Sequence, residues 1–501
     1  MVRHRGKRTP LRAHLAYLRR EGVTKDGAAG RMFDAEHDSA DHRAFADRCD
    51  GDRHHFRFIV SPEDAERLSD LKAFTRDLMA QAEWDLGMKL DWVGADHWNT
   101  DNPHIHVIVR GKWDDGHDLL IARDYICRGM RFRAAHIATL ELGPRSDLEI
   151  RCDLDTQVDA DRWTRLDRAI ADEAAQHGGL VDLRPGPDGA PEGHARSAMI
   201  ERMRKLEHLG LAEPLGPAQW QLSENAEPTM RALGERTDII KRIHRGLAER
   251  RIERSVCDFV VDGADVREPI VGRLVARGLD DELKGTAYAV IDGVDGRTHH
   301  VRLTDLDAAN DTGPGGIVEL RRFEDAARRQ CVALAVLSDM PLEAQVHAGG
   351  ATWLDRQLLA RESDALGSGG FGREVREAMG ARIGHLAGEG LARRQGQRVI
   401  FVRDLLDTLR RRELETTAAR IGLSAGLPYH PTKEGEAVAG VYRQRINLAS
   451  GRFAMIDDGL GFSLVPWSPS LERHIGRHVS GIAQASRIDW SFGRARGLAI
   501  G

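Results

Sequence analysis

The chain has 501 residues, and its 73 Lys and Arg against 78 Asp and Glu give a formal net charge of −5. That length suggests about three domains, and the acidic balance excludes a uniformly basic nucleic-acid coat while allowing a local basic patch. A hydrophobic content of 41% with 30% charged residues excludes a disordered chain. Because no run of about 18 apolar residues occurs, we expect no membrane insertion.

The cysteines and the N-terminus indicate the compartment. The chain has five widely spaced cysteines with no CxxC pair, so neither a disulfide framework nor a zinc knuckle is expected: Cys49, Cys127, Cys152, Cys257 and Cys331. The N-terminal stretch MVRHRGKRTP has no apolar core of the kind found in signal peptides. A reducing, cytoplasmic location is therefore expected.

Positive charge is concentrated at the start of the chain. Residues 1–23 hold seven Arg or Lys and a single acid, Glu21. Basic N-terminal arms commonly hold phosphate backbones, although a solvated terminus has the same composition. If the protein binds DNA, we expect it to bind locally, at this end.

The first third of the chain shows helix and strand patterns in alternation. Within 11–20, Leu11, Leu15 and Leu18 recur at helical spacing. A second helix is expected to begin with Ser61 as N-cap and to end at Gly87. The expected order is a helix over 11–20, a strand over His54–Val60, a helix over 61–86, strands over Leu90–His97 and His104–Val109, and a helix over Asp124–Leu142. This order predicts an α+β fold, an antiparallel sheet with flanking helices.

Beyond residue 177 the chain divides into smaller modules. The segment 178–194 is rich in Gly and Pro and is the expected domain boundary. A helix containing Met203 and Leu206 then leads to Gly210-Leu211-Ala212 and a short hairpin, and the pattern recurs 180 residues later, before and at Gly390-Leu391-Ala392. We interpret these as two winged-helix-like units, which bind DNA or proteins, with plain packing modules as the alternative.

The expected domains follow from these patterns. They are the antiparallel-sheet domain over 1–177, a winged-helix-like unit over 195–256, a small β-rich region over 257–350, and a second winged-helix-like unit with C-terminal β hairpins over 351–501. Turn signals at Asp295-Gly296, Ser450-Gly451 and Asp458-Gly459 predict the hairpins.

The sharpest chemical motif is HWNTDNPHIH at residues 97–106. His104 and His106 alternate along a strand and therefore share a face, and the turn brings His97 level with them. Three imidazoles on one sheet face can bind a divalent metal ion and leave positions open for substrate oxygens. The alternative is a polar face with spare histidines, but three within ten residues favour a metal site.

Tyr17 suggests what such a metal site would do. Imidazole ligation also fits zinc hydrolysis, but the HExxH motif is absent. Tyr17 lies in the basic N-terminal helix, and a phenol with a pKa of about 10 attacks well only where a cation stabilises the phenolate. Opposite a metal that holds a phosphodiester, Tyr17 could form a phosphotyrosyl intermediate. Taken on its own, without the metal site, Tyr17 fits a half-buried amphipathic residue better.

Several stretches resemble the relaxases (mobilization nucleases) of conjugative plasmids, in the HUH endonuclease superfamily. They are LRAHLAYLRREGV, GDRHHFRFIVSPED and DHWNTDNPHIHVIVRG. The chain is similar to the Ti-plasmid border-nicking type, and more closely to a bacterial subfamily with a long, uncharacterised C-terminal extension. The similarity covers most of the chain, with RDYICRGMRFRAA, ATWLDRQL (Ala351–Leu358), GRFAMIDDGLGFSLVPW and SFGRARGLAI as further matching stretches.

The resemblance implies an HUH-type antiparallel sheet and a nicking reaction that initiates conjugation. Tyr17 would attack single-stranded DNA at an origin of transfer, giving a 5′-phosphotyrosyl strand that the reverse reaction can rejoin. The implied metal is Mg²⁺ or Mn²⁺, bound by His97, His104 and His106. The implied phosphate contacts, at flanking positions, are Arg12, Arg19 and Arg20. Expected partners are accessory relaxosome proteins and a type IV secretion coupling protein.

The chain departs from the relaxase pattern in two places. Many relaxases carry an acid two residues after the first histidine, where this chain has Asn99. Asp96, Asp101 and His14 are the alternatives for the proton acceptor or for orienting the ligands. Only about ten residues precede the first helix, so we expect a shortened first strand.

Two other functions stay open from the sequence. One is a plasmid DNA-binding protein in which the nuclease core is degenerate and the basic arm and wing-like units act. The other is a metal-dependent hydrolase that uses the histidine triad with water.

Overall fold

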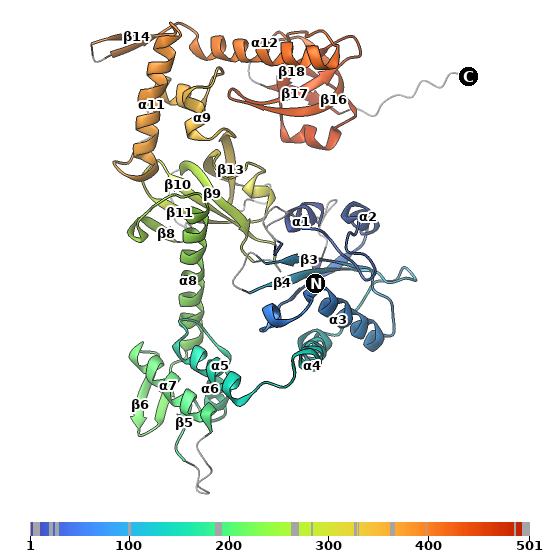
Figure 1. Ribbon diagram of the computed structural model, residues 1–501, viewed down its shortest axis with the longest axis vertical. Helices are drawn as coiled ribbons and strands as arrows, with labels where there is room; N and C mark the ends of the chain where they lie inside the picture. Colours follow the sequence, from blue (N-terminus) through green and yellow to red (C-terminus); the bar gives the residue numbers. More distant parts are fainter. Residues whose placement is uncertain are drawn as a thin grey trace. The chain divides into compact units, whose positions relative to one another are not determined.

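A computed structural model describes residues 2–3, 11–19, 24–25, 30–98, 102–185, 193–261, 270–281, 284–324, 328, 330–360, 366–396, 398–484 and 487–492. The chain divides into two compact units: unit 1 is 1–241 with 281–285, and unit 2 is 242–280 with 286–501. The division falls within helix α8 (Ala226–Glu249). Both units mix helices and sheets, as the α+β prediction requires (Figure 1). Within the described ranges, no helix is both long and apolar enough to cross a membrane.

Unit 1 begins with a four-stranded antiparallel sheet in the order β1-β2-β4-β3. The strands are β1 (Val2–Arg3), β2 (His54–Val60), β3 (Trp92–His97) and β4 (His104–Arg110). A backbone bridge from Phe33 to Gly94 extends the sheet beyond β3. The strand predicted over His54–Val60 is confirmed at both ends, and the shortened first strand is present as the two-residue β1.

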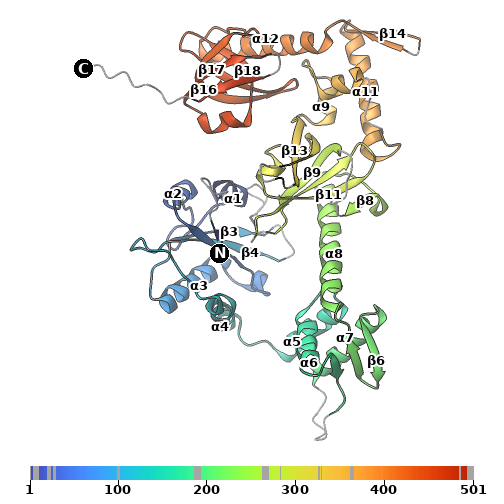
Figure 2. The same cartoon turned by 180° about the vertical axis from the view of Figure 1, so that it is seen from behind.

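Helices cover both faces of this sheet (Figures 1 and 2). Helices α1 (Leu11–Leu18) and α2 (His42–Arg48) pack on one face, in a core that includes Ala95 and Ile108. Helices α3 (Leu71–Leu86) and α4 (Met130–Leu142), which a π-helical turn over Tyr125–Gly129 precedes, share the core that includes Val107. Because successive side chains of a strand point to opposite faces, β3 and β4 supply both cores.

The helix expected to have Ser61 as its N-cap begins nine residues later, with Asp70 as N-cap and Leu71 as its first residue. A single 3-10 turn over Ala65–Arg67 comes first. The carboxylate of Asp70 accepts hydrogen bonds from two backbone N–H groups of the first helical turn, so Asp70 is the N-cap. The sequence prediction named only Ser61, and Asp70 is the cap because its carboxylate satisfies helix donors directly before the buried Leu71. Gly87, with φ 68°, ends the helix as predicted.

The rest of unit 1 is a helical module with a small sheet. Its elements are α5 (Asp147–Asp159), α6 (Arg165–Gln176), β5 (Leu180–Asp182), α7 (His194–His208), β6 (Ala212–Gly216), β7 (Gln219–Leu222) and the first part of α8. The segment 178–194 does not separate two domains here, contrary to expectation. Strand β5 lies within it and pairs with β7, and Ile170 and Met203, from either side of it, belong to one core.

Unit 2 contains two larger sheets, the two-stranded sheet β14-β15 and the helices between them. The first has the order β13-β12-β9-β10-β11-β8 and the second the order β18-β17-β16-β19-β20. The first sheet comprises β8 (Phe259–Val261), β9 (Val271–Leu279), β10 (Ala287–Gly293), β11 (Thr298–Leu303), β12 (Ile317–Glu324) and β13 (Gln330–Ser338), with 3-10 turns over Val256–Asp258 and Asp307–Ala309. The turn glycines predicted for the hairpins, Gly296, Gly451 and Gly459, all have positive φ.

The remaining elements of unit 2 are α9 (Leu342–Val346), α10 (Trp353–Leu359), α11 (Gly370–Gly388), β14 (Ala392–Gln395), β15 (Arg398–Phe401), α12 (Leu405–Ala425), β16 (Ala437–Leu448), β17 (Gly451–Asp457), β18 (Phe462–Pro466), a 3-10 helix (Pro469–His474), β19 (His478–Ala483) and β20 (Ile488–Ser491). Helix α11 leads into the β14–β15 hairpin as α7 leads into β6–β7. The structure therefore has a helix and a hairpin at both places where the sequence pattern recurs.

Each copy of this arrangement also buries an Arg–Asp ion pair. Arg202 and Asp167 are both 0% exposed in side chain, with Nε 2.7 Å from Oδ1. Arg382 and Asp355 are buried to the same degree, with the corresponding distance 2.9 Å. In each copy the guanidinium also donates to three backbone carbonyls, those of Val158, Ala160 and Arg162 in the first and of Val346, Ala348 and Gly350 in the second.

The spacing of these residues shows that the internal repeat begins earlier in the chain than the helix-and-hairpin pattern seen in the sequence. Asp355 follows Asp167 by 188 residues, and the three carbonyls follow their counterparts by the same interval. Both aspartates close a capping box with a threonine three residues earlier. The repeat therefore includes the paired helices before each helix-and-hairpin segment.

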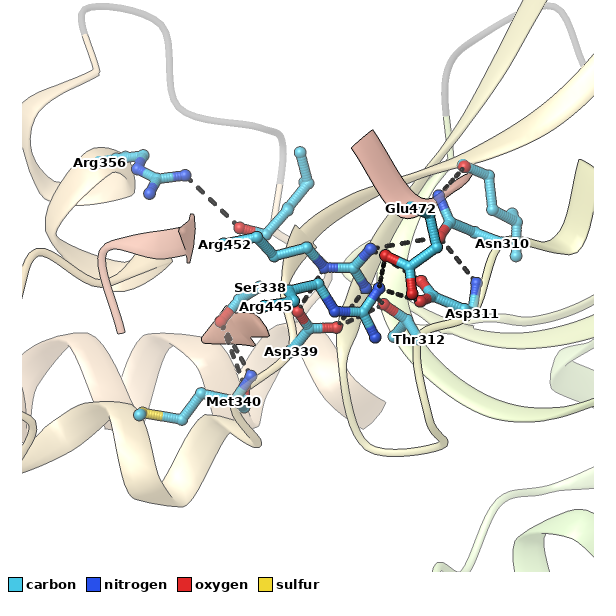
Figure 3. Close-up of polar contacts among 12 residues, drawn as sticks. Asn310, Asp311, Thr312, Ser338, Asp339, Met340, Arg356, Arg445, Arg452 and Glu472 are labelled. Atoms are coloured by element: carbon cyan, nitrogen blue, oxygen red, sulfur yellow. Dashed lines mark hydrogen bonds and ion pairs between the residues drawn. The ribbon is translucent and has the colours of Figure 1, made fainter. Parts of the chain in front are cut away.

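Within unit 2, Arg452 of β17 connects the five-stranded sheet to the end of β13. Its guanidinium binds Asp339 with Nε–Oδ2 2.6 Å and Nη2–Oδ1 2.7 Å, and Asp311 with Nη1–Oδ1 2.7 Å (Figure 3). Arg445 also pairs with Asp311, and both guanidinium groups lie 5.0–5.4 Å from the ring centre of Trp467. Burial by itself would raise the pKa of Asp339, but its hydrogen bonds, chiefly from Arg452, lower it overall.

Candidate metal centre

The three histidines of the motif meet on one face of the sheet. His97 lies directly opposite His104 across the β3–β4 pair, and His106 lies opposite Ala95, so all three side chains share a face. They are 0%, 8% and 4% exposed, respectively. One ring nitrogen from each lies within 4.8 Å of the others, and the Nε2 atoms of His104 and His106 are 3.1 Å apart.

Hydrogen bonds to backbone carbonyls orient two of the rings. His104 Nδ1 donates to the carbonyl of Asn102 at 2.8 Å, and His97 Nε2 donates to the carbonyl of Leu18 at 3.1 Å. A carbonyl only accepts, so each bond fixes a proton on that nitrogen and leaves the other ring nitrogen with a lone pair in the neutral imidazole. The same arrangement orients metal-binding histidines in general.

These residues fit a metal ion. Metal–nitrogen bonds of about 2.1 Å hold two ligand atoms up to about 4.2 Å apart, so the three rings need to move together by on the order of an ångström. The cluster is buried and all its donors are imidazole nitrogens, which suit several transition metals. The histidine triad could therefore hold a metal ion.

Helix α1 packs on this face of the sheet and carries two of the predicted residues, His14 and Tyr17. His14 is 4% exposed, and its ring meets that of His106 edge-on with centres 6.5 Å apart. Tyr17, which is partly buried against the same core, follows His14 by three residues and therefore lies on the same side of the helix. It also precedes Leu18, whose carbonyl accepts the hydrogen bond from His97.

Asp96 lies on the opposite face of the sheet, contrary to the sequence expectation. It pairs across the ladder with Ile105 rather than with a histidine, because neighbouring residues of a strand point in opposite directions. Its carboxylate instead lies 3.2 Å from Lys72 Nζ and accepts a hydrogen bond from Trp98 Nε1 at 3.1 Å. Asp96 therefore neither orients the histidines nor accepts a proton beside them. The alternative candidate Asp101 lies outside the described residues, as does Arg20.

The two other arginines expected to bind phosphate connect α1 with α2. Arg12 pairs with Asp47, and both side chains are well exposed. Arg19 Nη1 lies 2.9 Å from His42 Nε2. Burial, followed by the charge of Arg19, lowers the pKa of His42. To contact a phosphate, Arg12 would have to exchange its ion pair with Asp47 for that contact. The partner of Arg19 is the imidazole of His42 and not a carboxylate.

Arg57 shares the face of the triad and was not predicted as a site residue from the sequence. On β2, Arg57 lies opposite Ile108, and Ile59 lies opposite His106. Arg57 is 9% exposed, donates from Nε to His55 Nε2 at 3.0 Å, and forms no ion pair with a carboxylate of the described chain. Burial lowers the pKa of Arg57 to about 10. Because side chains alternate along the strand HHFRFIV, the sequence places Arg57 on the same face as His55. Only the pairing of β2 with β4 shows that this face also carries the histidine triad.

The second part of the chain matches a known protein family. Residues 199–330 and 321–499 match the family described as a protein of unknown function (DUF3363). These segments cover more than half of the chain, which therefore belongs to this family. They run from α7 into the segment after β20 and do not include the histidine triad. No curated protein and no solved structure matches the chain significantly.

Proposed function

We propose that this DUF3363 member is a relaxase, a nuclease that nicks single-stranded DNA at a plasmid origin of transfer through a covalent tyrosine adduct. The observation that carries the proposal is the buried histidine triad beneath the helix that contains Tyr17. Tyr17 is one residue from a carbonyl hydrogen-bonded to a triad ring, and His14 on the same helix face touches another. The resemblance of the two motifs to HUH relaxases supports the same assignment.

In the proposed reaction, Tyr17 Oη attacks the phosphorus of the scissile phosphodiester. The new P–O bond replaces the P–O3′ bond, so the 5′ end remains on the tyrosine and the other strand end leaves with a 3′-hydroxyl. The phenol proton passes to His14, a basic residue one helical turn away, and His14 then gives that proton to the leaving 3′ oxygen. Atoms and charge balance, and the reverse attack by the 3′-hydroxyl rejoins the strand.

A metal ion bound by the triad would supply one positive charge for the phosphate, and Arg57 would supply another. Mg²⁺ or Mn²⁺ bound by His97, His104 and His106 would polarise the phosphoryl oxygens. Arg57 offers a second positive charge on the same sheet face, and its burial raises the value of a charge-assisted hydrogen bond to phosphate. The carbonyl hydrogen bonds on His97 and His104 keep the ligand rings oriented.

The test uses the full chain with Mn²⁺ and a 3′-labelled pool of random-sequence single-stranded oligonucleotides. A nick leaves the labelled part of the strand on the protein, so we expect a labelled band that survives denaturing electrophoresis. Tyr17→Phe should abolish the band and retain DNA binding. Tyr125→Phe is the matched control, because the Tyr125 hydroxyl donates to Asp85 and burial raises its pKa.

Three outcomes would count against the proposal. No adduct from the wild-type chain in Mg²⁺ or Mn²⁺ would refute it. Cleavage that persists in Tyr17→Phe without any adduct would favour a hydrolase in which the triad activates water. Binding without cleavage by the wild-type chain would favour a DNA-binding protein with a degenerate nuclease core.

Metal binding is tested separately by titrating the chain with Mn²⁺ and measuring free ion by electron paramagnetic resonance. Loss of a second-shell partner typically costs 10–100-fold in metal affinity, so His104→Ala, which removes a ligand, should weaken binding by at least about 100-fold. Asp96→Asn, on the opposite face of the sheet, should leave the affinity unchanged. Equal affinity of His104→Ala and the wild-type chain would exclude the triad as the metal site.

A further inference from the structure

The hairpin β14–β15 of unit 2 carries a concentrated positive charge. The stretch from Ala392 to Arg403 contains four arginines and no acid. The side chains of Arg393, Arg394 and Arg398 are exposed, and none of them forms an ion pair or a side-chain hydrogen bond with another described residue. Arg403 is 96% exposed in side chain, and its nearest carboxylate, that of the adjacent Asp404, is 3.9 Å away.

The strand register shows that one face of the hairpin combines these charged side chains with a polar and an apolar side chain. Arg394 and Val399 face each other across the hairpin, as do Gln395 and Arg398. By alternation, Arg393, Gln395, Arg398 and Ile400 therefore share one face. Ile400 is 43% exposed, whereas Phe401, on the other face, packs against the core of the helices. The outward face thus combines two arginines, an amide and an exposed aliphatic side chain.

The first copy of the repeat provides an internal comparison. Leu211 and Leu391 each donate a backbone hydrogen bond to a leucine five residues earlier, which aligns the two hairpins. From that alignment, Glu213 takes the place of Arg393, and Gln219 takes the place of Arg398. The stretch from Ala212 to Glu224 has two acids and no Arg or Lys. The basic character therefore belongs to the second copy and not to the fold itself.

The two hairpins also differ in their edges. Strand β5 pairs with β7 and widens the first hairpin into a three-stranded sheet. In the second copy, β14 and β15 form a sheet of two strands among the described residues, and Figure 1 shows the hairpin extending beyond the ends of α11 and α12. A two-stranded ribbon is narrow enough to enter the major groove of B-form DNA, which is about 12 Å wide.

We propose that the β14–β15 hairpin is a second nucleic-acid site, which binds double-stranded DNA. Arg393 and Arg398 on the outward face contact phosphates, as do the exposed Arg394 and Arg403 at its margins, and Gln395 and Ile400 face the groove. An acidic peptide would satisfy the arginines, but it would not account for a protruding two-stranded ribbon with an amide and an aliphatic side chain between the charges. The site lies in the DUF3363 part of the chain and does not depend on the function proposed for the histidine triad.

The test measures binding of a fluorescent random-sequence DNA duplex to the full chain by anisotropy, over a range of salt concentrations. The variant Arg393→Gln/Arg394→Gln/Arg398→Gln removes three charges from exposed positions and should leave the fold intact. Each lost phosphate contact reduces the slope of log affinity against log salt by about 0.9, so we expect the slope to fall by about 2 to 3 and duplex binding to weaken at least tenfold.

A control variant removes the same charge elsewhere. Arg204→Gln/Arg236→Gln/Arg420→Gln alters three other exposed arginines on helices and should bind the duplex as the wild-type chain does. Equal losses in the two variants, or none in the hairpin variant, would overturn the proposal. So would hairpin-dependent binding of poly-glutamate without duplex binding, which would identify an acidic protein partner. Tyr17→Phe should keep full duplex affinity, so that failure of nicking and failure of this site are distinguishable.

Discussion

The buried ion pair of each repeat copy predicts a large and strictly local loss of stability. Asp167→Ala leaves the Arg202 guanidinium inside the protein, where both side chains are 0% exposed, with two of its five N–H groups unpaired. Breaking a buried pair by removing one partner costs about 3–5 kcal/mol. The free energy of opening α6 and α7 should fall by that amount, which corresponds to amide exchange faster by at least about 100-fold.

Hydrogen exchange measured by mass spectrometry on the full chain is the appropriate assay, because two compact units need not unfold in one transition. Peptides from α6 and α7 should lose protection in Asp167→Ala, and those from α10 and α11 should not. Asp355→Ala is the matched control and should give the reverse pattern. The double variant Asp167→Leu/Arg202→Met should be less destabilised than Asp167→Ala, because it leaves no buried charge. Unchanged protection of α6 and α7 in Asp167→Ala would refute this account.

Two further predictions concern titrating groups. Burial, with added repulsion from Asp52 and Asp91, raises the pKa of the Cys49 thiol to about 12. A thiol reagent at pH 8 should therefore modify the exposed Cys127, Cys152 and Cys257 in the native chain but reach Cys49 only after unfolding. Prompt labelling of Cys49 in the native chain would contradict its burial. In unit 2, burial would raise the pKa values of Asp311 and Asp339, but Arg445 and Arg452 lower that of Asp311, and Arg452 with Thr312 lowers that of Asp339. The resulting stability is complete above the ordinary carboxyl pKa of about 3.9 and is lost as the pH falls through the lowered values. The melting temperature should therefore drop less between pH 5 and pH 2 in Arg452→Gln than in the wild-type chain, and equal drops would show that the pair contributes no pH-dependent stability.

Much of the site could be predicted because it depends on local periodicity. Two residues separated by one position in a strand must share a face, so His104 and His106 were placed correctly without any structure. The turn between the strands then set His97 opposite His104. The same rule places Asp96 on the other side, so that error lay in the argument and not in a lack of information. The turn glycines are equally local, since φ is a property of one residue.

The sequence by itself thus determined the main strands and helices around the histidine motif, the histidine face and the recurrence of helix and hairpin, whereas it missed α2, α5 and α6. Only the tertiary structure decided the helix start at Leu71, the pairing of β5 with β7, and the presence of Arg57 on the triad face. It also revealed the arginine partners of Asp167 and Asp355, which lie 35 and 27 residues further along the chain. The physical reason is that helix caps, strand registers and buried ion pairs depend on which groups, often distant in sequence, come together in the fold to form the available hydrogen bonds and fill the buried volume. A short stretch of sequence contains only one of the groups that form each such contact.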